Sequence, residues 1–238
     1  MKLEEKFIYT SIETIMEEAV RACASLGGGI ETYPVSEYVF QALFLKMTGS
    51  QEQKLRCICW YIASFDYKFR YDYLDKYKEL HQFSALSDKT IVFGVIKDFI
   101  QRHDSKKVII TDAEKDKMIR DTTTSIANIF GPSSLKEWNQ RHYQGFKVWA
   151  TGIERGEVAN GAKLLTGKLK DMYDDLYENR NRYAHNTLSY QQNLPSMKSL
   201  VKGKEGGNYY EWFFLLILLD KIFINRFDVA KRIIDGFE

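Results

Sequence analysis

A short segment, residues 178–186, gathers side chains that could transfer protons and hold a phosphate. It contains Arg180, Arg182 and His185, which is one of only 4 histidines in the chain. A histidine titrates near neutrality and can accept or donate a proton, whereas an arginine presents a planar fork of N–H donors that fits a phosphate. The same residue types also end helices, because a cation complements the dipole at a helix C terminus. Both interpretations stay open.

Residues 180–185 read Arg-Asn-Arg-Tyr-Ala-His, an order that resembles the signature of the HEPN superfamily of small helical domains. In that family an arginine is followed by a polar residue, often asparagine, and then by a histidine after four to six positions. A small residue commonly precedes the histidine. The surroundings are also similar, since a long predicted helix leads into the motif, a loop follows, and a strongly apolar helix closes the domain. The resemblance covers residues from about 111 to 238, and the N-terminal half has no comparable match.

The resemblance implies a metal-independent endoribonuclease, possible roles being a toxin or a phage-defence effector. By position in the motif, Arg180 and His185 would be the catalytic pair and Asn181 the supporting polar residue. Cleavage of RNA through attack of its own 2′-hydroxyl needs a proton acceptor, a proton donor and positive charge beside the scissile phosphate, which these residue types supply. The alternative is a HEPN-like domain without nuclease activity that serves in dimerisation, nucleotide binding or partner binding.

Helix geometry constrains how these side chains can meet. Residues five apart lie about 140° apart around an ideal helix, whereas residues four apart share a face. Asn181 can therefore orient the imidazole of His185 within one chain. Arg180 must instead reach round the helix, sit where the helix distorts, or serve a site completed by another chain. Arg182 is the competing phosphate ligand, and we favour Arg180 because of the motif.

Other side chains near the motif could bind RNA. Tyr183 could stack on an unpaired base, although ordinary packing also explains it. Lys202 and Lys204 lie in a glycine-rich loop after the motif, where they could contact a phosphate backbone or simply face solvent. No cysteine or histidine set has the spacing of a zinc site, so we expect neither a metal ion nor another cofactor.

Apolar residues recur at helical spacing through most of the chain, which predicts an all-α helical bundle. Residues 111–114 form a capping box that should start a helix. Residues 106–110 are the only strand-like run. We expect helices at about 4–26, 36–47, 50–80 with a bend, 87–100, 112–130, 134–149, 158–185, and from 209 almost to the end.

We divide the chain between residues 105 and 106. Residues 1–105 would form an N-terminal helical region that regulates activity or binds a partner, and residues 106–238 a HEPN-like helical domain. The most apolar run, residues 212–219, is far shorter than the about 20 residues that span a bilayer, and it predicts a buried or interface helix. The charged N terminus lacks the apolar core of a signal peptide, so we expect a cytoplasmic protein without a membrane role.

Composition limits the classes of protein further. The chain has 238 residues, of which 45% are hydrophobic, so it can bury a sizeable core. Its net charge of +2 is too small for a protein that coats nucleic acid, although a local basic patch stays possible. The partners that we expect are RNA, a second copy of the chain, and an antitoxin or activating protein. The homodimer follows from the spacing of Arg180 and His185, from the run 212–219 being apolar on every face, and from the resemblance.

Overall fold

The computed structural model describes residues 3–27, 29–76, 83–185 and 208–236. Within these ranges the protein is all-α apart from one two-stranded hairpin, which confirms the fold class predicted from the apolar spacing. The helices are α1 (Leu3–Tyr9), α2 (Glu13–Ala22), α3 (Tyr33–Phe65), α4 (Tyr67–Lys76), α5 (Leu86–His103), α6 (Asp112–Phe130), α7 (Leu135–Trp138), α8 (Gln140–Thr151), α9 (Gly167–His185) and α11 (Tyr209–Asp235). The strands are β1 (Val158–Asn160) and β2 (Lys163–Leu165).

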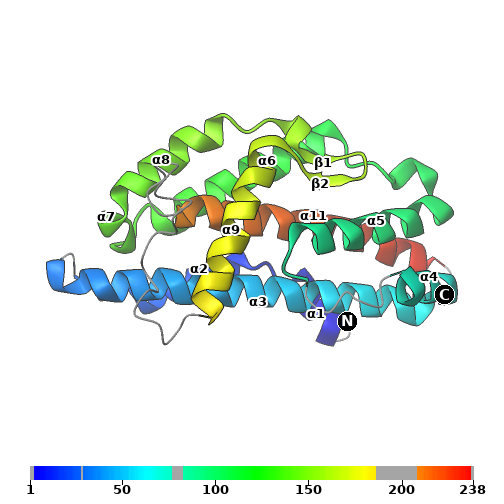
Figure 1. Cartoon of the computed structure of the whole chain (residues 1–238), viewed down its shortest axis with the longest axis horizontal. Coiled ribbons are helices and arrows are strands. Elements are labelled where there is room, and N and C mark those ends of the chain that lie inside the picture. Colours follow the sequence, from blue (N-terminus) through cyan, green and yellow to red (C-terminus); the bar gives the residue numbers. More distant parts are fainter. Residues whose placement is uncertain (1–2, 28, 77–82, 186–207, 237–238) are drawn as a thin grey trace.

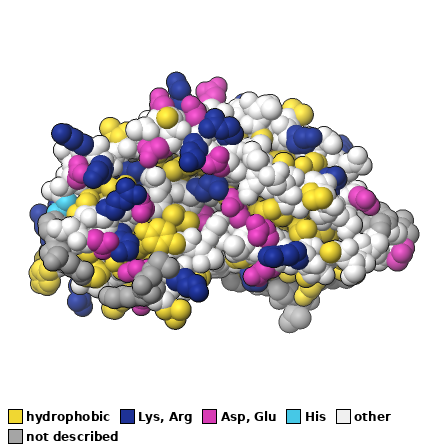
Figure 2. All heavy atoms as spheres, turned by 180° about the vertical axis from the view of Figure 1, so that it is seen from behind, with side chains coloured by type: hydrophobic (Ala, Val, Ile, Leu, Met, Phe, Trp, Pro, Cys, Tyr) yellow, Lys and Arg dark blue, Asp and Glu magenta, His cyan; other side chains and the backbone are white. Residues whose placement is uncertain are grey.

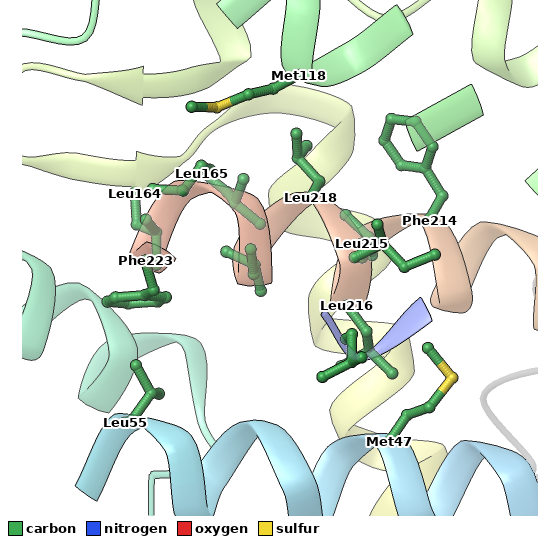
Figure 3. Packing of buried hydrophobic residues seen from close by; sticks show 14 of the residues in the cluster. Met47, Leu55, Met118, Leu164, Leu165, Phe214, Leu215, Leu216, Leu218 and Phe223 are labelled. Atoms are coloured by element: carbon green, nitrogen blue, oxygen red, sulfur yellow. The ribbon is translucent and has the colours of Figure 1, made fainter. Parts of the chain in front are cut away.

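Helix α11 lies at the centre of the protein (Figure 1). Every residue of the run 212–219 is buried at 0% exposure. In Figure 3, Leu218 points toward Met118 of α6, while Leu216 points toward Met47 of α3 on the other side. A helix that is apolar on every face needs neighbours all round it, and α3, α5, α6, α8 and α9 provide them. The prediction of a buried helix is confirmed.

The burial of α11 within one chain bears on the expected homodimer, and the lengths of the helices bear on the expected absence of a membrane role. One chain buries the run 212–219 completely, so no second chain is needed to cover it. The apolar character of this run therefore no longer supports a homodimer. Among the described helices, none is long and apolar enough to cross a membrane.

Helix α3 is a single long helix, so the expected break between residues 47 and 50 is wrong. Gly49 lies in its interior, where glycine costs only about 1 kcal/mol relative to alanine. The side-chain amide of Gln51 donates to the carbonyl of Leu216 (2.9 Å), which ties this stretch to α11. The expected bend further along is a break at Asp66, whose carboxylate accepts a hydrogen bond from the Phe69 N–H (2.8 Å) and caps α4.

The helix expected over residues 4–26 is divided into α1 and α2. The division is stabilised from inside the core, because the Lys54 ammonium donates to the carbonyl of Thr10 (2.7 Å) and the Ile12 N–H donates to the carboxylate of Asp220 (3.1 Å). Ser11 also accepts a hydrogen bond from the Glu13 N–H (3.2 Å). These backbone groups leave the helical pattern because buried charges bind them.

The two charges belong to a buried ion pair between α3 and α11. The Lys54 Nζ lies 2.6 Å from Asp220 Oδ1, and the two side chains are only 2% and 1% exposed. Burial raises the pKa of Asp220 and lowers the pKa of Lys54, while the attraction between the two acts in the opposite direction on each. Together with the Thr10 and Ile12 contacts, the pair has the hydrogen-bond partners that a buried ion pair requires.

The helix predicted from about residue 158 begins later, because a hairpin occupies residues 158–165. Val158 pairs with Leu165 and Asn160 with Lys163, so the loop has two residues. Gly161, the first loop residue, has φ +62°, which glycine adopts without a steric penalty. Glycine at the first of the two loop positions is one of the sequence patterns for such a turn.

Residues 106–110, the expected strand-like run, are not a strand. A 3₁₀ turn covers Ser105–Lys107, and Val108 and Ile110 point into the core. The buried guanidinium of Arg226 on α11 donates to the carbonyls of Lys107 and Val108, both at 3.0 Å. The backbone of this run is thus bound by a side chain rather than by a neighbouring strand.

Helix α6 confirms the predicted capping box. The Glu114 carboxylate accepts from the Thr111 N–H (2.7 Å), and the Thr111 hydroxyl accepts from the Glu114 N–H (3.3 Å). The helix ends at Phe130, as Gly131 and Pro132 predict. The next expected helix, at 134–149, is divided into α7 and α8 by Asn139, whose backbone is not helical.

One hydrophobic core crosses the expected boundary at residues 105 and 106. Helices α3 and α5 from the N-terminal side and α6, α8 and α9 from the C-terminal side all contact α11. The division stays a prediction about how the sequence is organised, and the packing gives it no separate core on each side.

Removing one member of the buried ion pair should strongly destabilise the protein. Lys54→Met leaves an unpaired carboxylate in the core, and Asp220→Leu leaves an unpaired ammonium, so each should lower the free energy of unfolding by about 3–5 kcal/mol. The double variant should lose less than the sum of the two. Urea denaturation of all four proteins measures this coupling. Glu18→Ala, which removes an exposed partner of Lys46, is the control and should change stability little. If the losses of the two single variants simply add in the double variant, the expectation is wrong.

Candidate functional site

Helix α9 carries the motif. It lies against both α3 and α11, and in Figure 1 it crosses in front of them. The helix begins at Gly167, whose φ of +53° no residue with a side chain adopts easily, and its described part runs to His185. The prediction that a long helix leads into the motif is confirmed. The side chain of His185 lies outside the described part, as do Lys202 and Lys204.

The guanidinium of Arg180 is held by two acceptors. Its Nη2 donates to Glu52 Oε1 on α3 (3.2 Å), and its Nη1 donates to Asn181 Oδ1 (3.2 Å). The side chains of Arg180 and Glu52 are 21% and 14% exposed, so the pair sits at the edge of the core. Glu52 Oε1 also accepts from the Ser84 hydroxyl (2.7 Å).

Buried polar groups continue inward from this pair. The ammonium of Lys89 on α5 donates to the carbonyl of Phe83 (2.7 Å), and the Tyr173 hydroxyl on α9 donates to the carbonyl of Ser84 (2.7 Å). These bonds fix the chain just before α5 against α9. A cavity of about 10 Å³, the size of one water molecule, lies among these groups, with Glu52 and Arg180 in its lining.

Lys89 is the buried cation of this cluster, with a side chain that is only 1% exposed. Burial lowers the pKa of Lys89 to about 7, while the nearby carboxylate of Glu52 acts to raise it and the guanidinium of Arg180 acts to lower it further. Burial also raises the pKa of the Tyr173 hydroxyl well above its usual value. The charge of the cluster therefore depends on whether Lys89 holds its proton near neutral pH.

Asn181 and Arg182 point to different partners. The side-chain oxygen of Asn181 accepts from Arg180, and whether Asn181 also orients His185 stays a prediction. Arg182 Nη1 donates to Asn179 Oδ1 (3.3 Å), and Asn179 is buried and donates to the carbonyl of Asp175 (2.9 Å). Of the two arginines, Arg180 is the one that joins the polar cluster.

Tyr183 packs against other aromatic rings. Its hydroxyl lies 3.1 Å from that of Tyr209, which donates to Glu37 on α3 (2.8 Å). Its ring stacks on Tyr209 and meets the edge of Phe44. Burial raises the pKa of the Tyr183 hydroxyl. These contacts are those of a packed residue, and stacking of Tyr183 on an RNA base stays a prediction.

Sequence reasoning missed the residues that surround Arg180. Glu52 and Lys89 come from the region before residue 106, where no motif was found. A signal was present for Lys89, because it lies three and seven residues before Val92 and Ile96, on the apolar face of its helix. A charged residue at such a position predicts a buried partner.

The comparisons with known proteins leave the family unassigned. No family model matches the chain, no curated protein matches its sequence, and no solved structure matches its fold. Membership in the HEPN superfamily accordingly stays a prediction based on residues 180–185 and on the order of helices. In the described ranges, no group of three or more His, Cys, Asp or Glu side chains is placed to hold a metal ion.

The buried ammonium of Lys89 should make stability depend on pH. The folded protein releases this proton near pH 7, whereas the unfolded chain keeps it to about pH 10.5, so the unfolded state binds more protons between these values. Stability should therefore rise with pH in this window, by about 2 kcal/mol between pH 7 and 9 from this group. Chemical denaturation of the wild type and of Lys89→Met at both pH values isolates the effect. Equal pH dependence in the two proteins would show that Lys89 titrates normally.

Proposed function

We propose that the protein is a metal-independent endoribonuclease of HEPN type, in which Arg180 and His185 act on the scissile phosphate. The observation that carries the proposal is the placement of Arg180 and His185 on one helix, with the guanidinium of Arg180 fixed by Glu52 and Asn181 and its side chain partly exposed. An arginine side chain has five N–H donors, and the described hydrogen bonds of Arg180 involve two of them. The remaining donors suit a phosphate.

The reaction assigned to this site needs only the RNA and the protein. The 2′-oxygen attacks the adjacent phosphorus as its proton passes to a base, the bond from phosphorus to the 5′-oxygen breaks, and that oxygen takes up a proton. The products are a cyclic phosphate and a 5′-hydroxyl. His185 would carry out one or both proton transfers, and Arg180 would stabilise the charge that develops on the phosphate oxygens. Asn181 would orient one of these two side chains.

RNA binding in this proposal depends on a local surface. Figure 2 shows the face opposite that of Figure 1, where Lys and Arg side chains are interspersed with Asp and Glu over the coloured part. That pattern agrees with the net charge of +2 and does not favour a broad phosphate-binding surface there. Arg182, Tyr183, Lys202 and Lys204 remain the proposed RNA contacts near the motif. The proposal places the protein in the cytoplasm, with an antitoxin or an activating protein as its partner.

A second candidate function has an observation of its own. Glu52 forms an ion pair with Arg180, and a carboxylate at this position partly offsets the positive charge that a phosphate would need. This contact favours a HEPN-like module that lacks nuclease activity and serves in dimerisation, nucleotide binding or partner binding. RNA cleavage by the purified wild type separates the two.

Cleavage should occur in EDTA and require both motif residues. His185→Ala should lose about 10²–10⁴-fold in rate, because a proton-transfer group is removed. Arg180→Lys should also lose much of the rate, since an ammonium cannot reproduce the fork of donors, whereas Arg182→Lys should stay close to the wild type. His103→Ala is the matched control, because His103 lies about 25 Å along α5 from its start beside Ser84. A folded wild type that leaves varied RNAs intact would favour the HEPN-like module without nuclease activity. If Arg182→Lys loses more rate than Arg180→Lys, Arg182 is the arginine that binds the scissile phosphate.

We further propose that the active form is a homodimer. The support is the angle of about 140° between Arg180 and His185 around α9, which lets one chain supply the arginine and the other the histidine. Mixing Arg180→Ala with His185→Ala protein should then restore cleavage, because one intact composite site forms in the heterodimer. Light scattering at micromolar concentration gives the oligomeric state. A fully active monomer would contradict the proposal.

A further inference from the structure

We propose that Glu52 is a positioning residue for Arg180, so that α3, from the region before residue 106, completes the site. This inference rests on the proposed ribonuclease function. It changes the role assigned to the N-terminal helices, which would then supply part of the site in addition to any regulation. The geometry that points to it is a closed set of contacts that begins and ends on α9.

The set of contacts runs through three segments. Arg180 on α9 donates to Glu52 on α3, Glu52 accepts from the Ser84 hydroxyl before α5, and the carbonyl of Ser84 accepts from Tyr173, again on α9. Tyr173 and Arg180 are seven residues apart, two turns along the same face of the helix. Glu52 is therefore held by Ser84 while it holds Arg180, and a carboxylate fixed in this way can define one orientation of the guanidinium.

Electrostatics favours a role in holding Arg180 over one in cancelling its charge. Lys89 lies close enough to the pair for Glu52 and Arg180 to affect its pKa in opposite directions. Asp88 also acts on Lys89, so with Lys89 protonated two cations face two carboxylates, and no net negative charge of the cluster opposes a phosphate. Since Lys89 is buried and Arg180 is partly exposed, the cation that a phosphate can reach is Arg180.

Preorganisation explains why this contact would help catalysis. An arginine side chain has many rotamers, and ordering it when the substrate binds costs conformational entropy. Glu52 engages Nη2 and Asn181 engages Nη1, so the guanidinium is already oriented before RNA arrives. Small losses of position in a catalytic group reduce rates greatly, which makes the effect measurable.

Cleavage kinetics of Glu52→Gln test the inference in the full-length protein. Gln keeps the size of the side chain and loses the charge, so kcat should fall about 10–100-fold with little change in KM. Glu13→Gln is the matched control, because Glu13 is 18% exposed and pairs with Lys221 at 2.7 Å, much as Glu52 pairs with Arg180. Its kcat should match that of the wild type. Thermal unfolding of each variant shows whether it is folded at the assay temperature.

A double variant distinguishes positioning from general destabilisation. If Glu52 acts through Arg180, then Glu52→Gln combined with Arg180→Lys should be no slower than Arg180→Lys alone. Independent losses that multiply, or a folded Glu52→Gln protein as active as the wild type or more active, would overturn the inference and leave the ribonuclease function standing. If the wild type cleaves no RNA, the proposed ribonuclease function itself is wrong. The wild-type reaction alone shows this outcome, so it is distinguished from a failure of the Glu52 inference.

Discussion

The buried ion pair between Lys54 and Asp220 is the contact on which the arrangement of the helices depends. Asp220 directly follows the apolar run at the centre of α11, at a depth where an unpaired charge is strongly unfavourable. Its partners are Lys54 and the backbone at Ile12, and Lys54 in turn binds the carbonyl of Thr10. Uniformly apolar side chains would tolerate a shift of α11 along α3. The pair does not, because its partners come together at one register only.

The same stretch of α3 serves both the core and the candidate site. Gln51 and Lys54, three residues apart, face α11, where they bind the carbonyl of Leu216 and the carboxylate of Asp220. Glu52 lies between them and faces α9, where it binds Arg180. The position of the motif arginine is therefore set by the contact that fixes the register of the central helix.

Much of this fold could be predicted from the sequence, because the signals are local. The capping box at Thr111, the end of α6 at Gly131 and the limits of α11 follow from caps and apolar spacing. The errors arose where distant groups override local ones: the break between α1 and α2 depends on charges from α3 and α11, and Arg226 binds the backbone of residues 106–110. The candidate site divides in the same way. Arg180 and Asn181 belong to one motif, whereas Glu52 is 128 residues from Arg180 and no local pattern connects them.

The central position of α11 also determines when the fold can form. All the helices that surround it precede it in the chain, and its contact with α3 joins Gln51 to Leu216 across 165 residues. A chain made from its N terminus thus lacks the packing partner that those helices share until α11 has been synthesised. Contacts between residues that are far apart in the sequence form slowly compared with each individual helix. The candidate site on α9 therefore reaches its packed arrangement only once α11 is in place.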